Sequence, residues 1–356
     1  MVGDMRLYHH DQLLQILRGR RPQRWIVLLG LIGTAILSAL LWQRLQPAQI
    51  VISTQPEITI PSSQNEPIQP IPLQVALDTN KVKLGEKLFA DTRLSIDNQV
   101  SCLSCHRLDL GGADRQPRST GANGIQTKVN TPTVFNVAYN FRFSWNGQFE
   151  TLEAQIEGLA QNVIGISWEQ VIPKLQQVPD YVQWFNAIYA DGITLPNVID
   201  AIAVYERSLN TPNSRFDQFL RGDYTALTVE EQEGYRLFKS YGCVSCHQGV
   251  NVGGNLFQKF GVIGNYFATR GNITLADYGR YNVTGSENDR YVFRVPSLRN
   301  VAITPPYFHD GTAQTLEQAI AVMAKYQLGR PLPQEHVRRI AQFLNTLTGE
   351  PPRSAS

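Results

Sequence analysis

Hydrophobic and polar positions divide the chain into three parts. The first part contains an uncharged apolar run over residues 25–42. At about 1.5 Å per residue, this run is long enough as a helix to cross most of the hydrocarbon core of a bilayer. Four arginines precede the run closely and only Arg44 follows it closely, so the positive-inside rule places the N-terminus in the cytoplasm. The pattern predicts a cytoplasmic tail over residues 1–24 and a membrane anchor over residues 25–42.

A signal peptide that is cleaved after the apolar run is the alternative to an anchor. The leading segment, residues 1–24, is long for a signal peptide, and no convincing A-x-A cleavage site follows the run. This favours the uncleaved anchor. With either interpretation, the rest of the chain is delivered to the extracytoplasmic side, which is the periplasm or its equivalent.

The second part, residues 43–72, has little periodic hydrophobicity and holds six prolines between Gln46 and Pro72. This composition is typical of an extended, semi-rigid linker, which rises about 3.1 Å per residue in polyproline II geometry. We expect the linker to let the globular region that follows it extend away from the membrane. The alternative is that part of the segment packs on the globular region.

The third part, from residue 73 onward, contains an internal repeat whose two copies match at a constant spacing. In each copy a Thr-Leu-Glu sequence precedes helical apolar spacing, and threonine suits the position that caps a helix. Strand patterns are sparse, so we expect an all-α fold of two tandem units, residues 73–222 and 223–350, with a short tail over residues 351–356. The matching positions are Pro132, Asn136, Val137, Ala138, Gly147, Thr151, Leu152 and Glu153 in the first copy, and Pro296, Asn300, Val301, Ala302, Gly311, Thr315, Leu316 and Glu317 in the second.

All four cysteines of the chain lie in two copies of the sequence C-x-x-C-H, one in each unit. In this motif each thiol adds to a vinyl group of haem, and the adjacent histidine ligates the iron. The sequence therefore predicts two covalently bound haem c groups and two cytochrome c-like domains. The residues concerned are Cys102, Cys105 and His106 in the first unit, and Cys243, Cys246 and His247 in the second.

Two other uses of four cysteines are two disulfide bonds and a structural zinc site. Neither needs a histidine after each second cysteine. A zinc ribbon also places its two pairs about 15–20 residues apart, whereas most of a domain separates these pairs. Haem is therefore the favoured interpretation.

The charge of the chain argues against nucleic-acid binding. Residues 1–24 hold five arginines and two aspartates, a net charge of +3, so the chain total of +2 leaves −1 for the rest. A nucleic-acid surface would need an excess of positive charge in the globular region.

The two copies of the repeat differ where a haem would need a second iron ligand. Trp145 in the first unit matches His309 in the second, and Leu159 matches Met323. By default a lone methionine in a helix fills a core. Next to a haem it is a candidate ligand, and ligation by histidine and methionine raises the reduction potential. We therefore expect the two haems to differ.

Longer stretches around these residues closely resemble the bacterial di-haem cytochrome c peroxidases and their MauG-like relatives, over about residues 85–345. The stretches are NTPTVFNVAYN and SWNGQ in the first unit, and FQKFGV, VPSLRNVAITPPYFHDG and TLEQAIAVMAKYQLG in the second. The resemblance implies that peroxide reacts at the first haem, while the second is a high-potential electron relay. It implies that His106 and His247 are proximal ligands and that Met323 is the distal ligand of the second iron.

Further roles follow from the same resemblance. Trp145 matches a tryptophan that lies between the haems and takes part in electron transfer, and the alternative is plain core packing. Gln155 matches the distal glutamine of the peroxide site. A calcium ion between the domains is implied as well, held through oxygen atoms of Asn130, Thr304 and Pro306.

Two positions depart from the family. The peroxidase branch carries a histidine that closes the peroxide site in the resting oxidised enzyme, and the matching residue here is Ala122. No histidine lies between the two haem motifs in this chain, apart from the one in the first motif. We therefore expect the first haem to be five-coordinate or water-bound without prior reduction.

The second departure concerns acid–base chemistry. The distal glutamate that the family places ten positions after its glutamine is Gly165 here. General acid–base help is commonly worth roughly 10²–10⁴ in rate, so this change counts against peroxidase activity. Glu157, Glu169 or a water chain anchored by Gln155 are alternatives, although solvated helix positions are the expectation for both glutamates.

The resemblance implies an enzyme that reduces hydrogen peroxide to water with electrons from a soluble cytochrome c or a cupredoxin. Electrons would enter at the second haem and reach the first by way of Trp145. A MauG-like oxidase of a protein or organic substrate is one alternative, which the open first haem favours and Met323 disfavours, since MauG itself has a tyrosine there. A membrane-tethered electron carrier or sensor without catalysis is the other. Members of the family are often homodimers.

Overall fold

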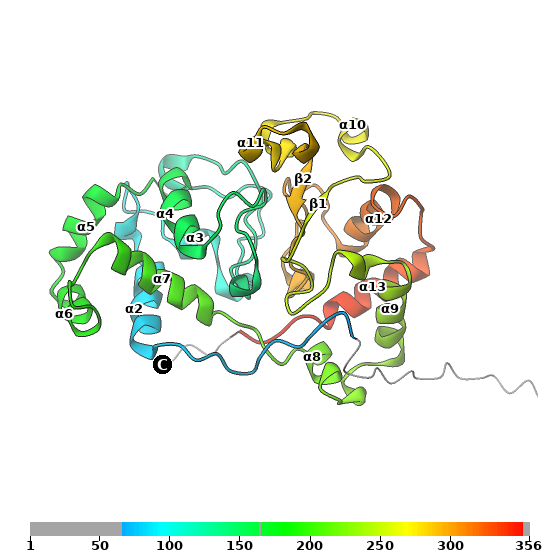
Figure 1. Ribbon diagram of the computed structural model, residues 1–356, viewed down its shortest axis with the longest axis horizontal. Helices are drawn as coiled ribbons and strands as arrows, with labels where there is room; N and C mark the ends of the chain where they lie inside the picture. The colour runs from blue at the N-terminus through cyan, green and yellow to red at the C-terminus, as the bar shows by residue number, and fades with distance from the viewer. Residues whose placement is uncertain (1–65, 164, 352–356) are drawn as a thin grey trace, which may run out of the picture. The chain divides into compact units, whose positions relative to one another are not determined.

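The computed structural model describes residues 66–163 and 165–351, and of residues 159–163 it describes the backbone alone. These residues form a mostly helical fold (Figure 1). The predicted cytoplasmic tail, the predicted membrane anchor and most of the predicted linker precede residue 66 and lie outside the described residues. Within the described part, no helix is both long and apolar enough to cross a membrane.

Helices account for nearly all regular structure in both units. The first unit contains α2 (Thr79–Phe89), α3 (Cys102–Cys105), α4 (Leu152–Val163), α5 (Trp168–Gln176), α6 (Pro179–Ile188) and α7 (Leu195–Ser208). They are followed by α8 (Arg215–Leu220), α9 (Val229–Ser240), β1 (Phe257–Lys259), α10 (Tyr266–Arg270), α11 (Tyr281–Thr284), β2 (Val292–Arg294), α12 (Leu316–Tyr326) and α13 (Gln334–Asn345).

One antiparallel pair of short strands departs from the all-α expectation. Strands β1 and β2 pair with Phe257 opposite Arg294, Gln258 opposite Phe293 and Lys259 opposite Val292. Every residue of β2 is buried, whereas β1 is only partly buried and its Lys259 is exposed. Both strands lie between the second haem motif and the repeated segment, where the second copy is longer than the first and comparison of the copies gives no guidance.

Two helices cross at a glycine in each unit. Gly85 of α2 packs against α7, where a methyl group in its place would overlap with the main-chain oxygen of Ala201. Gly234 of α9 packs against α13 in the same way, next to the main-chain oxygen of Arg339. Both crossings can be followed in Figure 1. Glycine is needed at these positions because the two backbones approach too closely for any side chain.

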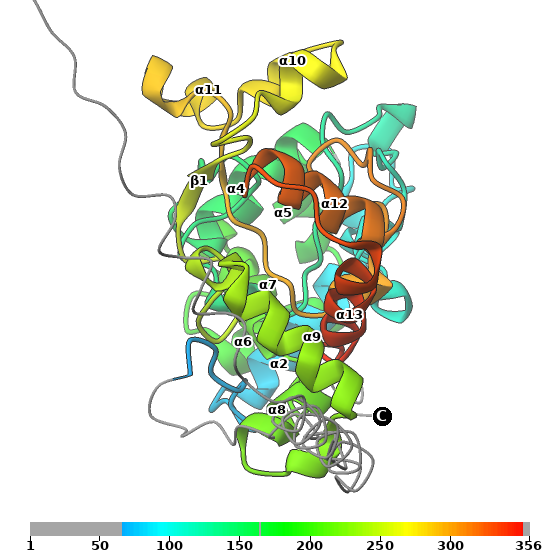
Figure 2. The same cartoon turned by 90° about the vertical axis from the view of Figure 1, so that its right-hand side faces the viewer.

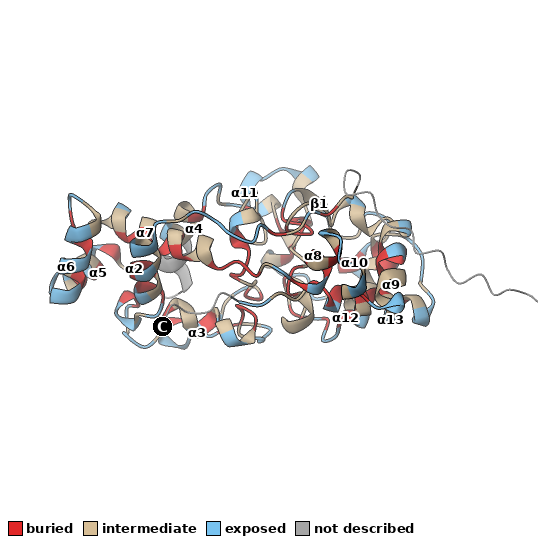
Figure 3. Cartoon of the chain, turned by 90° about the horizontal axis from the view of Figure 1, so that it is seen from below, coloured by how far each residue is buried: buried red, intermediate tan, exposed pale blue. Residues whose placement is uncertain are grey.

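Each crossing belongs to one hydrophobic cluster. Phe89 of α2 meets Tyr205 of α7 edge to face, and Phe238 of α9 packs on Phe343 of α13. Helix α12 lies beside α13 on the second cluster (Figure 2). In α2, α9 and α13, buried residues occur together with exposed residues of the same helix, as the colours of Figure 3 show. The same kind of helix pair therefore supports both haem motifs.

Gly234→Ala tests the close crossing. An alanine inside a helix normally adds about 1 kcal/mol of stability relative to glycine. At this crossing we expect the opposite sign, a loss of about 2 kcal/mol in the free energy of unfolding, because the methyl group overpacks the contact with α13. Urea unfolding of the haem-loaded chain measures the difference. Arg236→Ala on the exposed side of the same helix is the control, and its surface pair with Glu233 is worth at most about 1 kcal/mol. Unchanged or increased stability of Gly234→Ala would contradict the crossing.

A buried hydroxyl group links the two units. The side-chain amides of Asn136 and Asn300, which occupy equivalent positions of the repeat, both donate to Oγ1 of Thr211, at 2.8 and 2.9 Å. Both asparagines are completely buried and have a left-handed backbone, with φ of 59° and 60°. Thr211 returns a bond from its main-chain N–H to Oδ1 of Asn136, at 2.9 Å. This threonine lies on the connection between the units and joins the two copies of the repeat.

Residues 66–72, which we call the N-terminal strap, pack on the second unit although they lead into the first. Ile68 and Ile71 are buried, and Ile68 belongs to the same hydrophobic cluster as Phe216. The main-chain oxygen of Pro67 accepts from the N–H of Gly249 at 2.8 Å. This end of the predicted linker therefore contacts the globular region, which is the alternative that the sequence left open.

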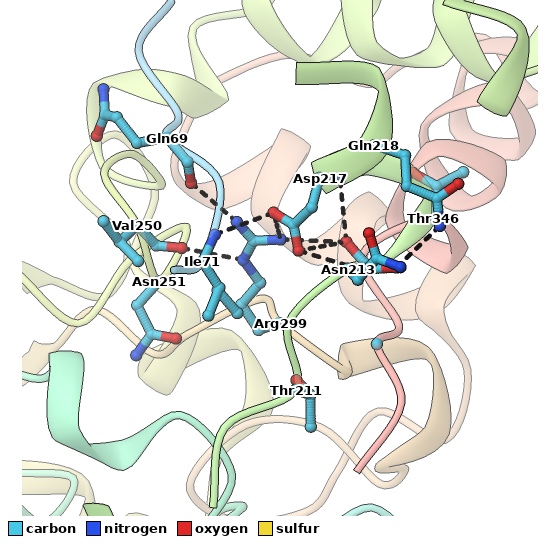
Figure 4. A network of polar contacts seen from close by, with 12 residues as sticks. Gln69, Ile71, Thr211, Asn213, Asp217, Gln218, Val250, Asn251, Arg299 and Thr346 are labelled. Atoms are coloured by element: carbon cyan, nitrogen blue, oxygen red, sulfur yellow. Dashed lines mark hydrogen bonds and ion pairs between the residues drawn. The ribbon is translucent and has the colours of Figure 1, made fainter. Parts of the chain in front are cut away.

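A buried ion pair holds the N-terminal strap (Figure 4). Arg299 and Asp217 lie 2.8 Å apart with no exposed side-chain surface. Arg299 donates to the main-chain oxygens of Gln69 and Val250, each at 3.0 Å, while Asp217 accepts from the N–H of Ile71 at 3.2 Å. The guanidinium and carboxylate thus satisfy each other and the strap backbone, as a buried ion pair requires.

Helix α8 places residues 215–220 with the second hydrophobic cluster, through Phe216 and Phe219. The sequence predicts a boundary between the units at residues 222 and 223. In the structure the core of the second unit thus begins before that position and also includes Ile68 from the strap.

Candidate haem-binding sites and the residues between them

Each of the two C-x-x-C-H motifs forms a tight turn of its own. The main-chain N–H of His106 donates to the oxygen of Cys102 at 2.8 Å, and the N–H of His247 donates to the oxygen of Cys243 at 2.9 Å. In the first unit the turn is α3, and in the second it is a single 3₁₀ turn over Cys243–Ser245. Each turn brings the second cysteine and the histidine next to the first cysteine, as attachment to one haem requires.

The two motif histidines are oriented by the same contact. Nδ1 of His106 donates to the main-chain oxygen of Gly112 at 3.2 Å, and Nδ1 of His247 donates to that of Val252 at 3.3 Å. A carbonyl group can only accept, so the proton lies on Nδ1 and the lone pair on Nε2 is available for a metal. Burial lowers the pKa of His106 below its ordinary value and that of His247 to about 4, which keeps both imidazoles neutral.

The cysteines do not behave as disulfide or redox cysteines in the described structure. None of the four forms a disulfide bond. Burial raises the pKa of Cys102 to about 12 and that of Cys243 to about 11. Reactive cysteines and zinc ligands have lowered pKa values because a nearby positive charge or metal stabilises the thiolate. The surroundings of these thiols are apolar instead, which suits attachment to a macrocycle.

A large apolar cavity lies in the second unit next to its motif. Cys243, Cys246 and His247 line one part of it, and Met323 of α12 lines it as well. A flat apolar group attached to the two cysteines fits such a cavity, and His247 and Met323 are the available iron ligands. The residues present therefore fit a haem c. Apolar side chains from α9, α12 and α13 complete the wall, namely Phe238, Leu316, Ile320, Ile340 and Leu344.

Trp145 lies where the two units meet and lines the same cavity. Its indole N–H donates to the main-chain oxygen of Asn130 at 2.8 Å, and its own main-chain oxygen accepts from the N–H of Arg294 at 2.9 Å. The indole meets the ring of His309 edge to face, with centroids 6.3 Å apart. The tryptophan is thus fixed by contacts to both units.

A buried polar cluster contacts Trp145 through the ring of His309. Nε2 of His309 and Oδ1 of Asp277 lie 2.7 Å apart, and both residues are almost fully buried. Arg270 makes ion pairs with Asp277 and Asp310. Despite burial, the bonds from the His309 imidazole, the Arg270 guanidinium and Thr274 hold the pKa of Asp277 well below its usual range. The guanidinium already supplies the positive charge that these two carboxylates need. The sequence comparison singled out His309 but not its partners.

The three residues of the implied calcium site contribute to the lining of the same cavity. Asn130, Thr304 and Pro306 all line it. The main-chain N–H of Asn130 donates to the main-chain oxygen of His309 at 2.8 Å, and its side-chain Nδ2 donates to the main-chain oxygen of Gln116 at 2.8 Å. The three residues thus share a cavity, and their role as calcium ligands stays a prediction.

The residues expected on the distal side of the first haem gather only in part. Ala122 is 3% exposed and follows Ser119, whose side chain hydrogen-bonds to Cys105. A methyl group at Gly165 would lie 3.7 Å from Cβ of Ala122 and 2.9 Å from Ile96. The two positions that depart from the family therefore lie beside each other, next to the first motif.

The three candidate acid–base residues lie on α4 and α5 of the first unit. Gln155 is half-buried in the first half of α4, while Glu157 and Glu169 are exposed. Exposure agrees with the expectation that both glutamates are solvated helix residues. Gly165 has φ of +64°, a conformation that a glutamate would adopt only with strain.

Comparison with known proteins decides the family. A family model described as "Di-haem cytochrome c peroxidase" matches residues 79–225. The chain is 43% identical over 313 residues to the cytochrome c peroxidase Ccp of Escherichia coli (strain K12), covering 87% of this chain and 66% of that protein. It is 43% identical over 291 residues to the cytochrome c551 peroxidase of Nitrosomonas europaea, covering 81% of this chain and 86% of that protein. The chain belongs to the di-haem cytochrome c peroxidase and MauG family.

The fold agrees with this membership. The crystal structure of a MauG-like protein associated with microbial copper homeostasis superimposes with a TM-score of 0.67 at 28% identity, covering 80% of this chain and 93% of that chain. The chain is therefore an oxidoreductase of the cytochrome c peroxidase family, and the family carries two haems. The resemblance inferred from the motifs is confirmed, as is the mostly helical fold.

The sequence did not predict that two arginines of the second unit are buried. Arg299 is 1% exposed and Arg294 is 5% exposed, although arginine is usually a surface residue. Arg299 lies in the stretch VPSLRNVAITPPYFHDG that carried the resemblance, and Arg294 directly precedes it, but a single sequence does not say which arginines are buried. Their partners lie far away along the chain, so no local pattern reveals them.

Proposed function

We propose that the chain reduces hydrogen peroxide to water at the first haem, with electrons that a small redox protein delivers to the second. The observation that carries this proposal is the difference between the two sites. The cavity of the second unit offers His247 and Met323 together, whereas the first unit offers His106 and has an alanine where the closing histidine of the family stands. A six-coordinate iron suits electron relay and an open iron suits binding of a small substrate.

Haem c, when bound, supplies an iron that exchanges single electrons in the second unit and binds peroxide in the first. His106 and His247 hold the irons through Nε2, and their Nδ1 bonds to carbonyl oxygens keep the imidazoles neutral and fixed in orientation. Trp145 supplies an aromatic ring between the units, held at both its indole N–H and its main-chain oxygen. The amide of Gln155 orders peroxide or water on the distal side.

Proton movement is the step for which this chain differs from the family. Gly165 has no side chain that could replace the family glutamate, so we propose that water ordered by Gln155 moves the proton between the peroxide oxygens. A proton relay through water is slower than a positioned carboxylate, and we expect a rate below that of relatives that keep the glutamate.

The remaining roles belong to the same proposal. Asn130, Thr304 and Pro306 hold a calcium ion through oxygen atoms between the units, which suits a hard cation. The electron donor is a soluble cytochrome c or a cupredoxin. Bacterial members of the family are periplasmic, and we propose that residues 25–42 anchor this chain in the membrane with both haem domains, residues 73–222 and 223–350, on the extracytoplasmic side.

A MauG-like oxidation of a protein or organic substrate is the second candidate function. Ala122 favours it, because a first haem without a closing histidine reacts with peroxide before any electron donor arrives. Met323 favours the peroxidase function instead, since a methionine ligand makes the second haem an acceptor of electrons from an external donor protein.

Electron paramagnetic resonance of the oxidised, haem-loaded chain tests the proposal, followed by stoichiometric peroxide without reductant. We expect a high-spin signal that peroxide abolishes, beside a low-spin signal that it leaves in place. Rapid consumption of peroxide with a reduced cytochrome or cupredoxin would then establish the peroxidase. Reaction with peroxide but no turnover with either donor would favour the MauG-like function, and two low-spin signals indifferent to peroxide would overturn both.

A further inference from the structure

Arg294 is a buried cation without an anion of its own. It ends β2, a strand in which every residue is buried, and its side chain is 5% exposed. It makes no ion pair with any carboxylate in residues 66–163 and 165–351. Its guanidinium donates to two neutral oxygens, Oδ1 of Asn140 at 3.0 Å and, less closely, the main-chain oxygen of Ser144 at 3.4 Å. Five N–H donors and a full positive charge are therefore poorly matched by what surrounds them.

Arg299, the other buried arginine of this unit, differs from Arg294 because its charge is paired within the fold. Its guanidinium has Asp217 at 2.8 Å and main-chain oxygens around the rest of its edge. Burial lowers the pKa of Arg294 to about 10, and no neighbouring carboxylate among the described residues offsets this effect. An unpaired buried charge is costly, so a charge of opposite sign is needed at Arg294.

The position of Arg294 indicates where that charge lies. Arg294 and Asn140 line the cavity of the second unit together with Cys246 and His247. Among the described residues that line this cavity there is no aspartate or glutamate. A haem c attached to this motif carries two propionate groups, and a guanidinium binds a carboxylate through two parallel hydrogen bonds.

We propose that Arg294 binds a propionate of the second haem and thereby sets the reduction potential of that haem. This inference rests on the proposed function, because it needs a haem on Cys243 and Cys246. Arg294 also donates its main-chain N–H to the oxygen of Trp145. The propionate is therefore held on the side of the cavity where the proposed electron path to the first unit begins.

The pair has a consequence for the pH dependence of the potential. With Arg294 present, the propionate stays ionised over the neutral range and the potential does not depend on its titration. Without the guanidinium, the buried propionate takes up a proton more readily, and its pKa rises into the measurable range. Oxidised iron is the more positive form and favours the ionised propionate, so the potential then falls as pH rises through that pKa. Asn140, Ser144 and Trp145, which contact Arg294, do not titrate there. The other basic residues that line the cavity are His247, Lys259, Arg299 and His309, and they are the same in the original chain and in the variants.

Arg294→Gln in the full haem-loaded chain tests this. Redox titrations between pH 5 and pH 9 follow the His/Met haem by its absorbance. We expect a flat potential in the original chain, and in Arg294→Gln a potential that falls with pH and lies below the original at pH 9. Arg294→Lys, which keeps the charge, should retain a nearly flat potential. Arg290→Gln removes the same charge at a surface pair with Glu287. This variant should change neither the potential of the second haem nor its dependence on pH.

The outcomes separate this inference from the function on which it rests. Two covalent haems by pyridine haemochromogen, with a flat and unshifted potential in Arg294→Gln, would overturn the role of Arg294 and leave the peroxidase untouched. A second motif without haem would overturn the proposed function first. If Arg294→Gln does not fold, a crystal structure of the haem-loaded original chain decides. A propionate oxygen within hydrogen-bond distance of the guanidinium is expected, and a free anion or a water in that place would refute the pair.

Discussion

Met323→Leu is expected to lower peroxide turnover with a reduced donor by about 100-fold or more. Met323 lines the cavity of the second unit with His247, and leucine has a similar volume but no sulfur to bind iron. Loss of a methionine ligand lowers the reduction potential, and a fall of about 120 mV corresponds to about 100-fold in a one-electron equilibrium. Leucine is also the residue that the first copy of the repeat has at the matching position, Leu159. Steady-state turnover and a redox titration of the second haem measure the effect.

Ile320→Leu is the matched control for this change. Ile320 lies about one turn before Met323 on α12 and lines the same cavity, so the substitution alters packing without removing a ligand. We expect its turnover and potential to stay close to those of the original chain. If Met323→Leu kept both the low-spin His/Met spectrum and the potential, Met323 would be a core residue and the assignment of the relay would be wrong.

The sequence predicted the haem motifs and the family because both are local patterns. Each C-x-x-C-H motif is contiguous in the chain, and the constant spacing of the repeat relates one unit to the other without any knowledge of contacts. Comparing the copies drew attention to Trp145, His309 and Met323, and the structure places all three along one cavity. Helical spacing after each Thr-Leu-Glu sequence also predicted α4 and α12, because a helix is held together by neighbours along the chain.

The contacts that the sequence did not predict join residues that lie far apart. Arg299 is paired with Asp217, which belongs to a much earlier part of the chain, and both hold the N-terminal strap. The strap itself was interpreted as linker because its prolines indicate an extended segment. Ile68 and Ile71 have the spacing that places two side chains on one face of a polyproline II helix, and this spacing was the available signal. Strands β1 and β2 lie where the second copy of the repeat is longer than the first.

Ala122→His is expected to close the first site. The loop that begins at Ser119 lies against Cys105, and Ala122 in that loop is buried beside Gly165. The peroxidase branch that this chain resembles carries a histidine here, and we expect an imidazole at residue 122 to bind the first iron in the same way. If it occupied the iron in about 99% of the molecules, the rate of reaction with peroxide would fall by about 100-fold, because only the open fraction reacts. Stopped-flow mixing of the oxidised chain with peroxide measures this rate.

The spectrum and the effect of reduction make the test specific for iron ligation. The high-spin signal of the first haem should be replaced by a low-spin signal in Ala122→His, and reduction of the second haem should restore the reaction with peroxide. Asn123→His is the control, since it adds the same imidazole at an exposed neighbouring position whose φ of 55° histidine tolerates better than most residues. A high-spin, peroxide-reactive Ala122→His would mean that this loop does not face the first iron. The ready reaction of the original oxidised chain would then depend on some other feature of the distal side, of which Gln155 is the first to test.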